Sequence, residues 1–209
     1  MMPAICRLTL THFVLLQNVI AVSADLYPFG RSIGDTRAAS NDDGSISVNI
    51  SSFFPFFNYQ HKSLFVNTNG VISLRGKVPN FTPEPFPLAF NKSLIAPYWT
   101  DVNTKLRGDI WYRQSTDDSL LQNASAEIKA VFPEHYRFQA SWIFVATWDN
   151  VPFLEPILQV SPRQRCTFQC LLITNERISL TIFMYHKIEW TTGTASGGNA
   201  STGLGGTPA

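Results

Sequence analysis

The sequence predicts a mainly β domain with one packed helix, arranged as an antiparallel sandwich or an open barrel. Three observations lead to this prediction. Apolar residues recur at every second position in several short segments, which is typical of half-buried strands. Turn-forming Gly, Pro and Asn residues separate these segments. A single longer segment, residues 117–132, repeats its apolar residues at the spacing of a helix.

The first predicted strand follows a lead rich in Gly, Asp and Ser at residues 30–44. Ile46, Val48 and Ile50 alternate with polar residues in this strand. Four phenylalanines then surround Pro55, namely Phe53, Phe54, Phe56 and Phe57. Because proline cannot donate a ladder hydrogen bond, this segment is expected to be an edge or bent strand.

A hairpin is predicted where residues 64–66 and 71–74 flank a short turn. Its Asn69-Gly70 step accepts the positive φ that a tight turn needs. The next segment, residues 76–91, carries Pro79, Pro83, Pro85 and Pro87 and cannot form a regular helix or a central strand. We expect an ordered loop, pinned to the body by Phe81, Phe86 and Phe90. Further strands are expected at residues 94–99 and 108–113.

The one predicted helix spans residues 117–132, with Thr116 as its cap and Pro133 closing it. Its apolar residues share one side of the helical wheel: Leu120, Leu121, Ala124, Ile128, Val131 and Phe132. Asn123 projects away from the centre of that side, so a glycan attached there would face water.

The last predicted strands lie between residues 137 and 185. Residues 137–148 are apolar on both faces, which predicts a central strand. Residues 166–174 and 177–185 are joined through Asn175-Glu176, a two-residue link that suits a second hairpin. A Gly-rich end follows without another strand. We therefore expect one domain over residues 25–209, truncated at its C-terminus.

The N-terminus has the layout of a secretory signal peptide. Arg7 is the only charged residue among the first 24, and a mostly apolar stretch at residues 8–22 follows it. Small residues at Val22-Ser23-Ala24 suit a cleavage site, so residues 1–24 are predicted to be removed before Asp25. A membrane anchor is less favoured, because the apolar stretch is short and interrupted by polar residues.

The predicted mature chain carries 15 basic and 15 acidic side chains. This balance, without a basic stripe, argues against nucleic acid as a partner, and no second apolar segment is long enough to span a membrane. Five Asn-x-Ser/Thr triplets are candidate glycosylation sites: Asn49, Asn80, Asn91, Asn123 and Asn199. The triplets and the signal peptide together predict a secreted glycoprotein. Asn49 lies within a predicted strand and could be too close to the fold to be modified.

Two cysteines, Cys166 and Cys170, remain in the predicted mature chain. On one strand they point to the same face about 13 Å apart, whereas a disulfide needs Cα atoms about 5.5 Å apart. We favour buried free thiols. A local bulge, or a partner cysteine on another chain, is the alternative. A zinc site is not expected, since no neighbouring His or Cys completes a tetrahedral set.

The sequence contains no recognisable catalytic motif. His61, His135 and His186 stand in no metal-ligand spacing, and no nucleophile elbow or phosphate-binding fingerprint is present. Asp101, Asp109 and Asp149 adjoin aromatic strands, where a glycosidase could hold paired carboxylates, but capping of turns is the favoured interpretation. We predict no enzymatic activity and no cofactor.

Two short motifs remain as candidates for binding. Asp101 and Asn103 resemble the opening of a calcium loop, although Lys105 stands where a third ligand belongs and the invariant glycine is missing. The tripeptide Arg107-Gly108-Asp109 resembles an integrin-recognition sequence. A strand is predicted to begin at once after it, which would hold the carboxylate against the sheet. Otherwise no metal site is predicted.

Five ordered blocks of the sequence resemble the nidogen-type extracellular (NIDO) domain family. They are residues 64–74, 81–88, 95–102, 144–151 and 188–198. The resemblance covers residues 27–209, and the Tyr27-Pro28-Phe29 opening is most similar to tectorin-type members. Two departures stand out: Cys166 replaces an expected Asn, and the chain ends before the family's last strand. An edge strand left unpaired in this way is an aggregation risk.

The resemblance implies a non-enzymatic extracellular module near the N-terminus of a larger mosaic glycoprotein. Its implied role is cell–matrix adhesion or assembly of an apical matrix, with matrix or cell-surface proteins as partners. The alternatives are a secreted carbohydrate-binding sandwich and, more distantly, a hydrolase. A sugar platform needs two or three tryptophans side by side in water. The candidates are Trp99, Trp111, Trp142, Trp148 and Trp190.

Overall fold

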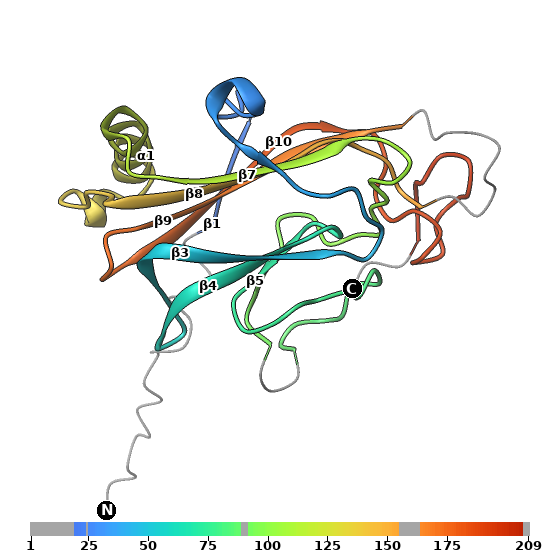
Figure 1. The fold of residues 1–209 in the computed structure, drawn as a ribbon, viewed down its shortest axis with the longest axis horizontal. Coiled ribbons are helices and arrows are strands. Elements are labelled where there is room, and N and C mark those ends of the chain that lie inside the picture. The colour runs from blue at the N-terminus through green and yellow to red at the C-terminus, as the bar shows by residue number, and fades with distance from the viewer. Residues whose placement is uncertain (1–18, 24, 89–91, 155–163, 207–209) are drawn as a thin grey trace, which may run out of the picture.

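The computed structural model describes residues 19–23, 25–88, 92–154 and 164–206. They form a sandwich of a six-stranded and a four-stranded β-sheet, with a helix beside the larger sheet (Figure 1). The predicted fold class, a mainly β sandwich with a packed helix, is confirmed. Neither described sheet closes into a barrel.

The six-stranded sheet has the order β1-β10-β9-β8-β7-β2. Its strands are β1 (Val19–Ser23), β2 (Thr36–Arg37), β7 (Asp109–Ser115), β8 (Trp142–Val151), β9 (Cys166–Thr174) and β10 (Ser179–Ile188). Neighbours are antiparallel except β1, which runs parallel to β10. The central position predicted for the strand near residue 148 is confirmed, because β8 pairs with β7 on one side and β9 on the other.

The four-stranded sheet has the order β3-β4-β5-β6. Its strands are β3 (Ser45–Phe56), β4 (Tyr59–Asn67), β5 (Val71–Ser73) and β6 (Leu94–Ile95). The predicted hairpin is confirmed as β4 and β5, and Gly70 in its turn has a φ of 74°. As predicted, β3 is an edge strand, and its pairing with β4 is irregular between Asn49 and Phe54.

The main core fills the space between the two sheets. Trp148 of β8 stacks on Phe168 of β9 with ring centroids 5.0 Å apart, and its indole N–H donates to the carbonyl of Thr68 across the sandwich. Trp190 is also fully buried and donates its indole N–H to Val151 O at 3.0 Å. Buried indoles need such acceptors, and the Trp148 bond links the two sheets, whereas the Trp190 bond holds the segment after β10 against the end of β8.

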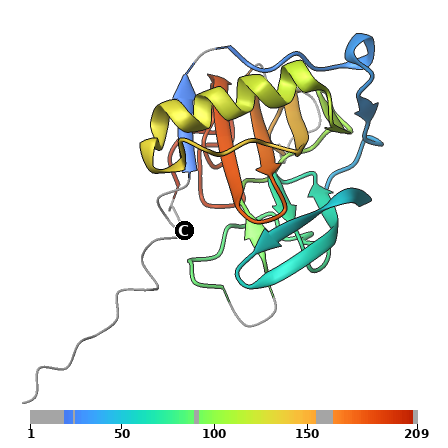
Figure 2. The same ribbon diagram turned by 90° about the vertical axis from the view of Figure 1, so that its left-hand side faces the viewer.

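A second core lies between helix α1 (Asp118–Val131) and the outer face of the six-stranded sheet. Figure 2 shows α1 lying across the strands of this sheet, on the side away from the four-stranded sheet. Leu121, Ala124 and Ile128 are buried against residues of β8, β9 and β10. Val131, the last residue of α1 and predicted to share this side, is exposed instead.

The helix cap differs from the prediction. Asp117, in extended conformation, accepts the backbone N–H of Leu120 on its carboxylate at 2.9 Å. Thr116 was therefore the wrong cap, since only the side chain one residue later reaches the free N–H groups of the first turn. Two short 3-10 helices are also described: η2 (Arg31–Ile33) precedes β2, and η3 (Pro133–His135) follows α1.

Three predicted strands have different bounds in the structure. β8 begins at Trp142 rather than at residue 137, because η3 and the bond from Phe138 N to His135 O keep the preceding segment curled. β6 stops at Ile95, before Pro97, which has no N–H to extend the ladder. The link between β9 and β10 is residues 175–178 rather than two residues, because Asn175 Oδ1 accepts the N–H of Ile178 and widens the turn.

The proline-rich loop is anchored differently from the prediction. Val78 is buried, and its N–H donates to Asn67 Oδ1 at 3.0 Å. Phe81 and Phe86 are exposed, so they do not pin the loop to the core. Phe90 lies outside the described residues. One small apolar residue and a buried amide thus replace the aromatic anchors that the sequence favoured.

The predicted signal peptide lies mostly outside the described residues, apart from β1. Cleavage before Asp25 stays a prediction, and it would remove β1 and leave β10 at the sheet edge. The segment after the cleavage point is bound independently of β1. Gln169 accepts the N–H of Tyr27 at 2.9 Å and donates to the Tyr27 carbonyl at 3.0 Å.

Candidate functional site

Three aspartates from two distant segments meet beside the β4–β5 turn. Asp42 and Asp43 lie in the segment before β3, and Asp101 lies between β6 and β7. One carboxylate oxygen of each residue lies within 4.8 Å of those of the other two. We call Asp42, Asp43 and Asp101 the acidic cluster.

A buried asparagine in the turn holds the cluster together. Asn69 donates its side-chain N–H to Asp43 Oδ1 at 2.8 Å, and its Oδ1 accepts the N–H of Val102 at 2.9 Å. Asn69 therefore touches both segments that carry the aspartates. Those segments are also bonded directly, since Thr104 N–H donates to Asn41 O and Asn41 N–H donates to Thr104 Oγ1. The positions of the carboxylates are thus set by the fold.

The cluster brings carboxylates together without an ion-pair partner among the described residues. Asp101 is only 3% exposed, and its Oδ1, like that of Asp42, is buried without a hydrogen-bond partner. None of the ion pairs among the described residues includes a cluster member. Burial, and then the charges of Asp42 and Asp43, raise the pKa of Asp101 to about 7. Burial and Asp43 also raise the pKa of Asp42, against the opposing effect of Lys105.

The sequence-based calcium prediction named one member of this cluster. Asp101 belongs to it. Asn103 is buried two residues further along the chain, and its Oδ1 accepts the N–H of Lys105 at 3.0 Å. Asp42 and Asp43 were missed, because adjacent aspartates in a Gly/Asp/Ser-rich segment are typical of a surface loop. No local spacing connects them with residue 101.

The Arg107-Gly108-Asp109 tripeptide lies at the start of β7. Asp109 is the first residue of that strand, and its Oδ1 accepts the Nε–H of Arg37 from β2 at 2.6 Å. Gly108 has a φ of 78° and lies against Asn150, where an added Cβ would meet the Asn150 carbonyl oxygen at 2.6 Å. The carboxylate is therefore engaged within the sheet, whereas Arg107 is exposed.

The candidate glycosylation sites lie on different parts of the surface. Asn49, Asn80, Asn123 and Asn199 are exposed, and Asn91 lies outside the described residues. Asn49 is on the edge strand β3 and Asn123 is on α1. Use of each site stays a prediction.

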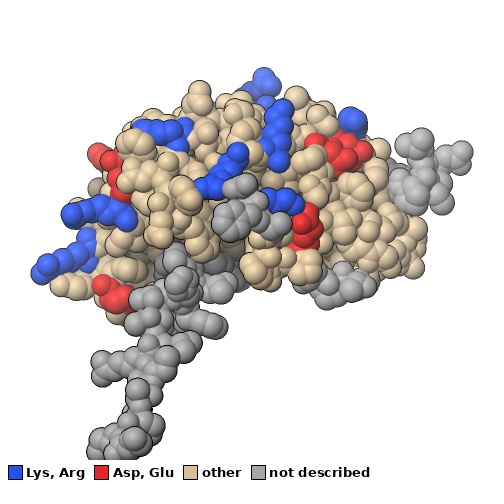
Figure 3. Space-filling view, turned by 90° about the horizontal axis from the view of Figure 1, so that it is seen from below, with Lys and Arg blue, Asp and Glu red and all other residues tan. Residues whose placement is uncertain are grey.

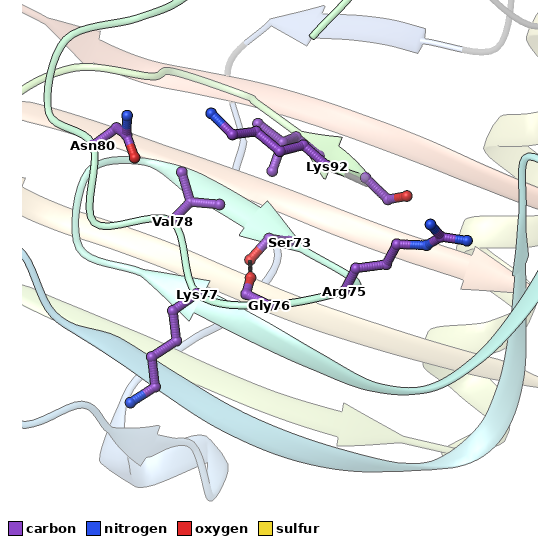
Figure 4. A pocket seen from close by; sticks show the side chains of 9 residues that line it. Ser73, Arg75, Gly76, Lys77, Val78, Asn80 and Lys92 are labelled. Carbon is purple, nitrogen blue, oxygen red and sulfur yellow. Dashed lines mark hydrogen bonds between the residues drawn. The ribbon is translucent and has the colours of Figure 1, made fainter. Parts of the chain in front are cut away.

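A small pocket of about 90 Å³ opens beside the proline-rich loop. Arg75, Lys77 and Lys92 line it, but Figure 4 shows their cationic ends pointing in different directions. Lys92 also pairs with Glu84 at 2.7 Å. The three cationic groups therefore do not converge on a position where one anion could bind. On the face seen in Figure 3, acidic and basic side chains are interspersed among larger uncharged areas.

The two cysteines of β9 are free and buried in the core between the sheets. The favoured prediction of buried free thiols is confirmed. Burial raises the pKa of Cys166 to about 11 and that of Cys170 well above its ordinary value. Such thiols are unreactive, because the thiolate is the nucleophile.

The fold defines the class of this protein as a two-sheet β-sandwich module with a packed helix. A family model described as the nidogen-like domain matches residues 62–209. The chain belongs to the nidogen-like domain family.

Curated relatives agree with this family. The chain is 45% identical to alpha-tectorin of Gallus gallus over 184 residues, which cover 88% of this chain and 8% of that protein. It is 39% identical to alpha-tectorin of Mus musculus, covering 93% and 9%, and 32% identical to nidogen-2 of Mus musculus, covering 84% and 13%. The chain thus spans less than a tenth of the length of the tectorins it matches. No solved structure gave a significant match.

Tectorins and nidogens are secreted proteins of the extracellular matrix, and the chain is an extracellular matrix module. The predictions of the family and of an extracellular location are confirmed. Among the described residues, no helix combines the length and the apolar character needed to cross a bilayer.

Proposed function

We propose that this chain is a non-enzymatic adhesion module that binds matrix or cell-surface proteins, as the N-terminal part of a larger mosaic glycoprotein. The relatives support this proposal, because the chain matches a small part of structural matrix proteins rather than an enzyme. Its partner is expected to be a protein recognised by shape and apolar contact, since the predicted mature chain has no net charge.

One observation carries the proposal, namely the aromatic tip of the β3–β4 hairpin. Phe57 is 58% exposed and Tyr59 is 56% exposed, and Phe53 is exposed beside them. The tip lies at the lower left of Figure 1, away from the helix. Aromatic residues are enriched at the centres of protein interfaces, where their burial contributes most of the binding energy.

The backbone conformation at the tip is unfavourable for a bulky residue, which indicates a functional role for the aromatic side chain found there. Phe57 and Asn58 form a two-residue link with φ angles of 45° and 63°, the conformation of a type I′ turn. Asn and Gly adopt it readily, whereas a bulky phenylalanine is disfavoured there. The Phe57 ring contacts Phe56 edge-on, with centroids 4.6 Å apart, yet most of it stays exposed in a strained position, and binding would explain that exposure.

Cations lie over two rings of the tip. Lys62 Nζ lies 3.9 Å from the centroid of Phe53, and the Arg75 guanidinium lies 4.0 Å from that of Tyr59. These contacts limit the motion of the rings, and less freedom is then lost on binding.

The test measures retention of the secreted, tagged chain in matrix deposited by cultured cells, after the cells are removed with detergent. Phe57→Asn removes the ring and its contact with Phe56, and asparagine suits the turn better than phenylalanine, which offsets that loss. Tyr59→Ser removes the second ring. Tyr136→Ser is the matched control, because Tyr136 is also exposed beneath a guanidinium, that of Arg137.

We expect wild type and Tyr136→Ser to be retained equally. Each tip variant should lose at least about fivefold, corresponding to about 1 kcal/mol of binding energy. Wild-type retention no greater than that of an unrelated secreted domain would contradict the matrix role. Equal retention of the tip variants would contradict the choice of surface.

Carbohydrate binding is the second candidate, favoured by a different aromatic pair. Phe86 is 62% exposed and contacts the partly exposed Trp99 edge-on, at 6.5 Å between centroids. Trp111 is also partly exposed, but it lies on the helix side of the six-stranded sheet, whereas Trp99 packs beside Val71 and Leu94 of the other sheet. The two tryptophans therefore do not form one platform. Binding on a glycan array that is lost in Phe86→Ala would favour this candidate.

A further inference from the structure

The acidic cluster places two buried carboxylate oxygens where no described side chain or backbone group bonds them. A buried ionised carboxylate is normally paired with a cation or fully hydrogen-bonded. The Oδ1 atoms of Asp42 and Asp101 have neither kind of partner, and Asp101 is almost completely buried. These atoms are acceptors, so a cation is the ligand that would satisfy them.

From this geometry we infer that Asp42, Asp43 and Asp101 bind a calcium ion that joins the segment before β3 to the segment after β6. Calcium binds oxygen ligands at about 2.3–2.6 Å, so two oxygens on opposite sides of it lie about 4.8 Å apart. The three carboxylate oxygens fall within that distance of one another. Zinc would call for Cys or His ligands, and the cluster contains neither.

The surrounding bonds preorganise the site. Asn69 positions Asp43 and the backbone at Val102, and the carbonyl of Asp101 accepts the N–H of Leu154 at 3.1 Å. A bound ion would therefore connect these two segments without rearranging them, and little conformational entropy would be lost on binding. Lys105 is the nearby cation that acts on Asp42, and it offsets the negative charge that would remain beside a divalent ion.

The expected consequence is stabilisation of one end of the sandwich in the calcium-rich space outside the cell. Extracellular calcium modules bind with a Kd of about 0.1–1 mM. The site is separate from the aromatic tip, so its test does not depend on the proposed matrix partner.

The experiment uses the full chain as secreted from cultured cells and stripped of metal with a chelator. Calcium chloride is titrated by calorimetry, and thermal unfolding is followed with calcium, with magnesium and with sodium chloride of equal ionic strength. For a Kd near 0.3 mM, 10 mM calcium should raise the Tm by about 4–8 °C. Magnesium should have a much smaller effect, because it needs a tighter octahedral site at about 2.0–2.1 Å.

Two variants locate the site. Asp101→Asn removes the buried charge, and Asp43→Ala removes the carboxylate of an exposed residue without creating a new Asn-x-Ser/Thr triplet. Each should weaken calcium binding at least about tenfold, the effect of about 1.4 kcal/mol. Asp149→Asn is the control, because Asp149 is a partly buried carboxylate of β8 outside the cluster, and its calcium response should equal that of wild type.

Several results would overturn the inference. Wild type without a calcium-dependent rise in Tm would remove the site. Equal stabilisation by magnesium would overturn the assignment to calcium. An unchanged calcium affinity in Asp43→Ala, in a variant that folds normally, would show that the ion binds elsewhere.

Discussion

Gly70 in the β4–β5 turn cannot be replaced without moving a neighbouring segment. Its φ is 74°, and a Cβ added to it would lie 1.9 Å from the carbonyl oxygen of Tyr98. That oxygen belongs to the backbone, so it cannot move aside as a flexible side chain would. Gly70→Ala should therefore destabilise the domain by more than the ordinary cost of alanine in a turn.

The expected magnitude has three parts. The left-handed conformation costs about 1–2 kcal/mol for an L-residue, and displacing the packed Tyr98 segment costs about 1–3 kcal/mol. Loss of freedom in the unfolded chain offsets about 0.4–1 kcal/mol of this. The net loss of about 2–4 kcal/mol corresponds to a Tm lower by roughly 5–15 °C in a domain of this size.

The assay is urea denaturation followed by tryptophan fluorescence, with thermal unfolding as a second measure. Gly76→Ala is the matched control, since a Cβ there meets nothing within 4 Å and its φ is not positive. It should be neutral or slightly stabilising. Equal stability of the Gly70 and Gly76 variants would refute the steric reasoning.

Three further predictions concern buried or paired side chains. Burial lowers the pKa of His61, whose Nδ1–H donates to Leu74 O at 3.0 Å, so the unfolded chain takes up a proton near pH 6.5 before the folded protein does. Between pH 8 and pH 5 this titration should cost wild type stability that His61→Phe does not lose, whereas protonation of Asp101, whose pKa is about 7, stabilises both proteins equally as pH falls. Urea midpoints at the two pH values should therefore fall more, or rise less, in wild type than in His61→Phe, and identical shifts in the two proteins would count against this. Cys166 and Cys170 should not react with a thiol reagent in the native protein, because both are buried. Both should react fully in concentrated guanidinium chloride. Rapid labelling of the native protein would contradict their burial. Asp109→Glu should not change the attachment of cells to a surface coated with the protein, because Arg37 already engages this carboxylate. A loss of attachment would show instead that a receptor uses the tripeptide.

Local patterns predicted the elements of the fold well. The alternation at Ile46, Val48 and Ile50 and the Asn69-Gly70 turn correspond to β3 and to the β4–β5 hairpin. The helix at residues 117–132 is present within one residue at each end. These features depend on the preferences of neighbouring residues, which are read directly along the chain.

Element ends and anchors were less predictable. Val78 rather than Phe81 or Phe86 holds the proline-rich loop, and β8 begins later than its apolar pattern suggests. In both places, whether a side chain is buried depends on which distant part of the fold packs against it. The apolar character of a residue does not predict that contact.

The sequence by itself determined a mainly β domain with secretory features, because strand periodicity, turn residues and the N-terminal pattern are local properties. Only the tertiary structure decided that Asp42 and Asp43 meet Asp101, and that Asp109 is paired with Arg37. Contacts between residues far apart in the chain depend on strand register and sheet packing. The candidate binding sites therefore came from the fold, while the class of protein could be read from the chain.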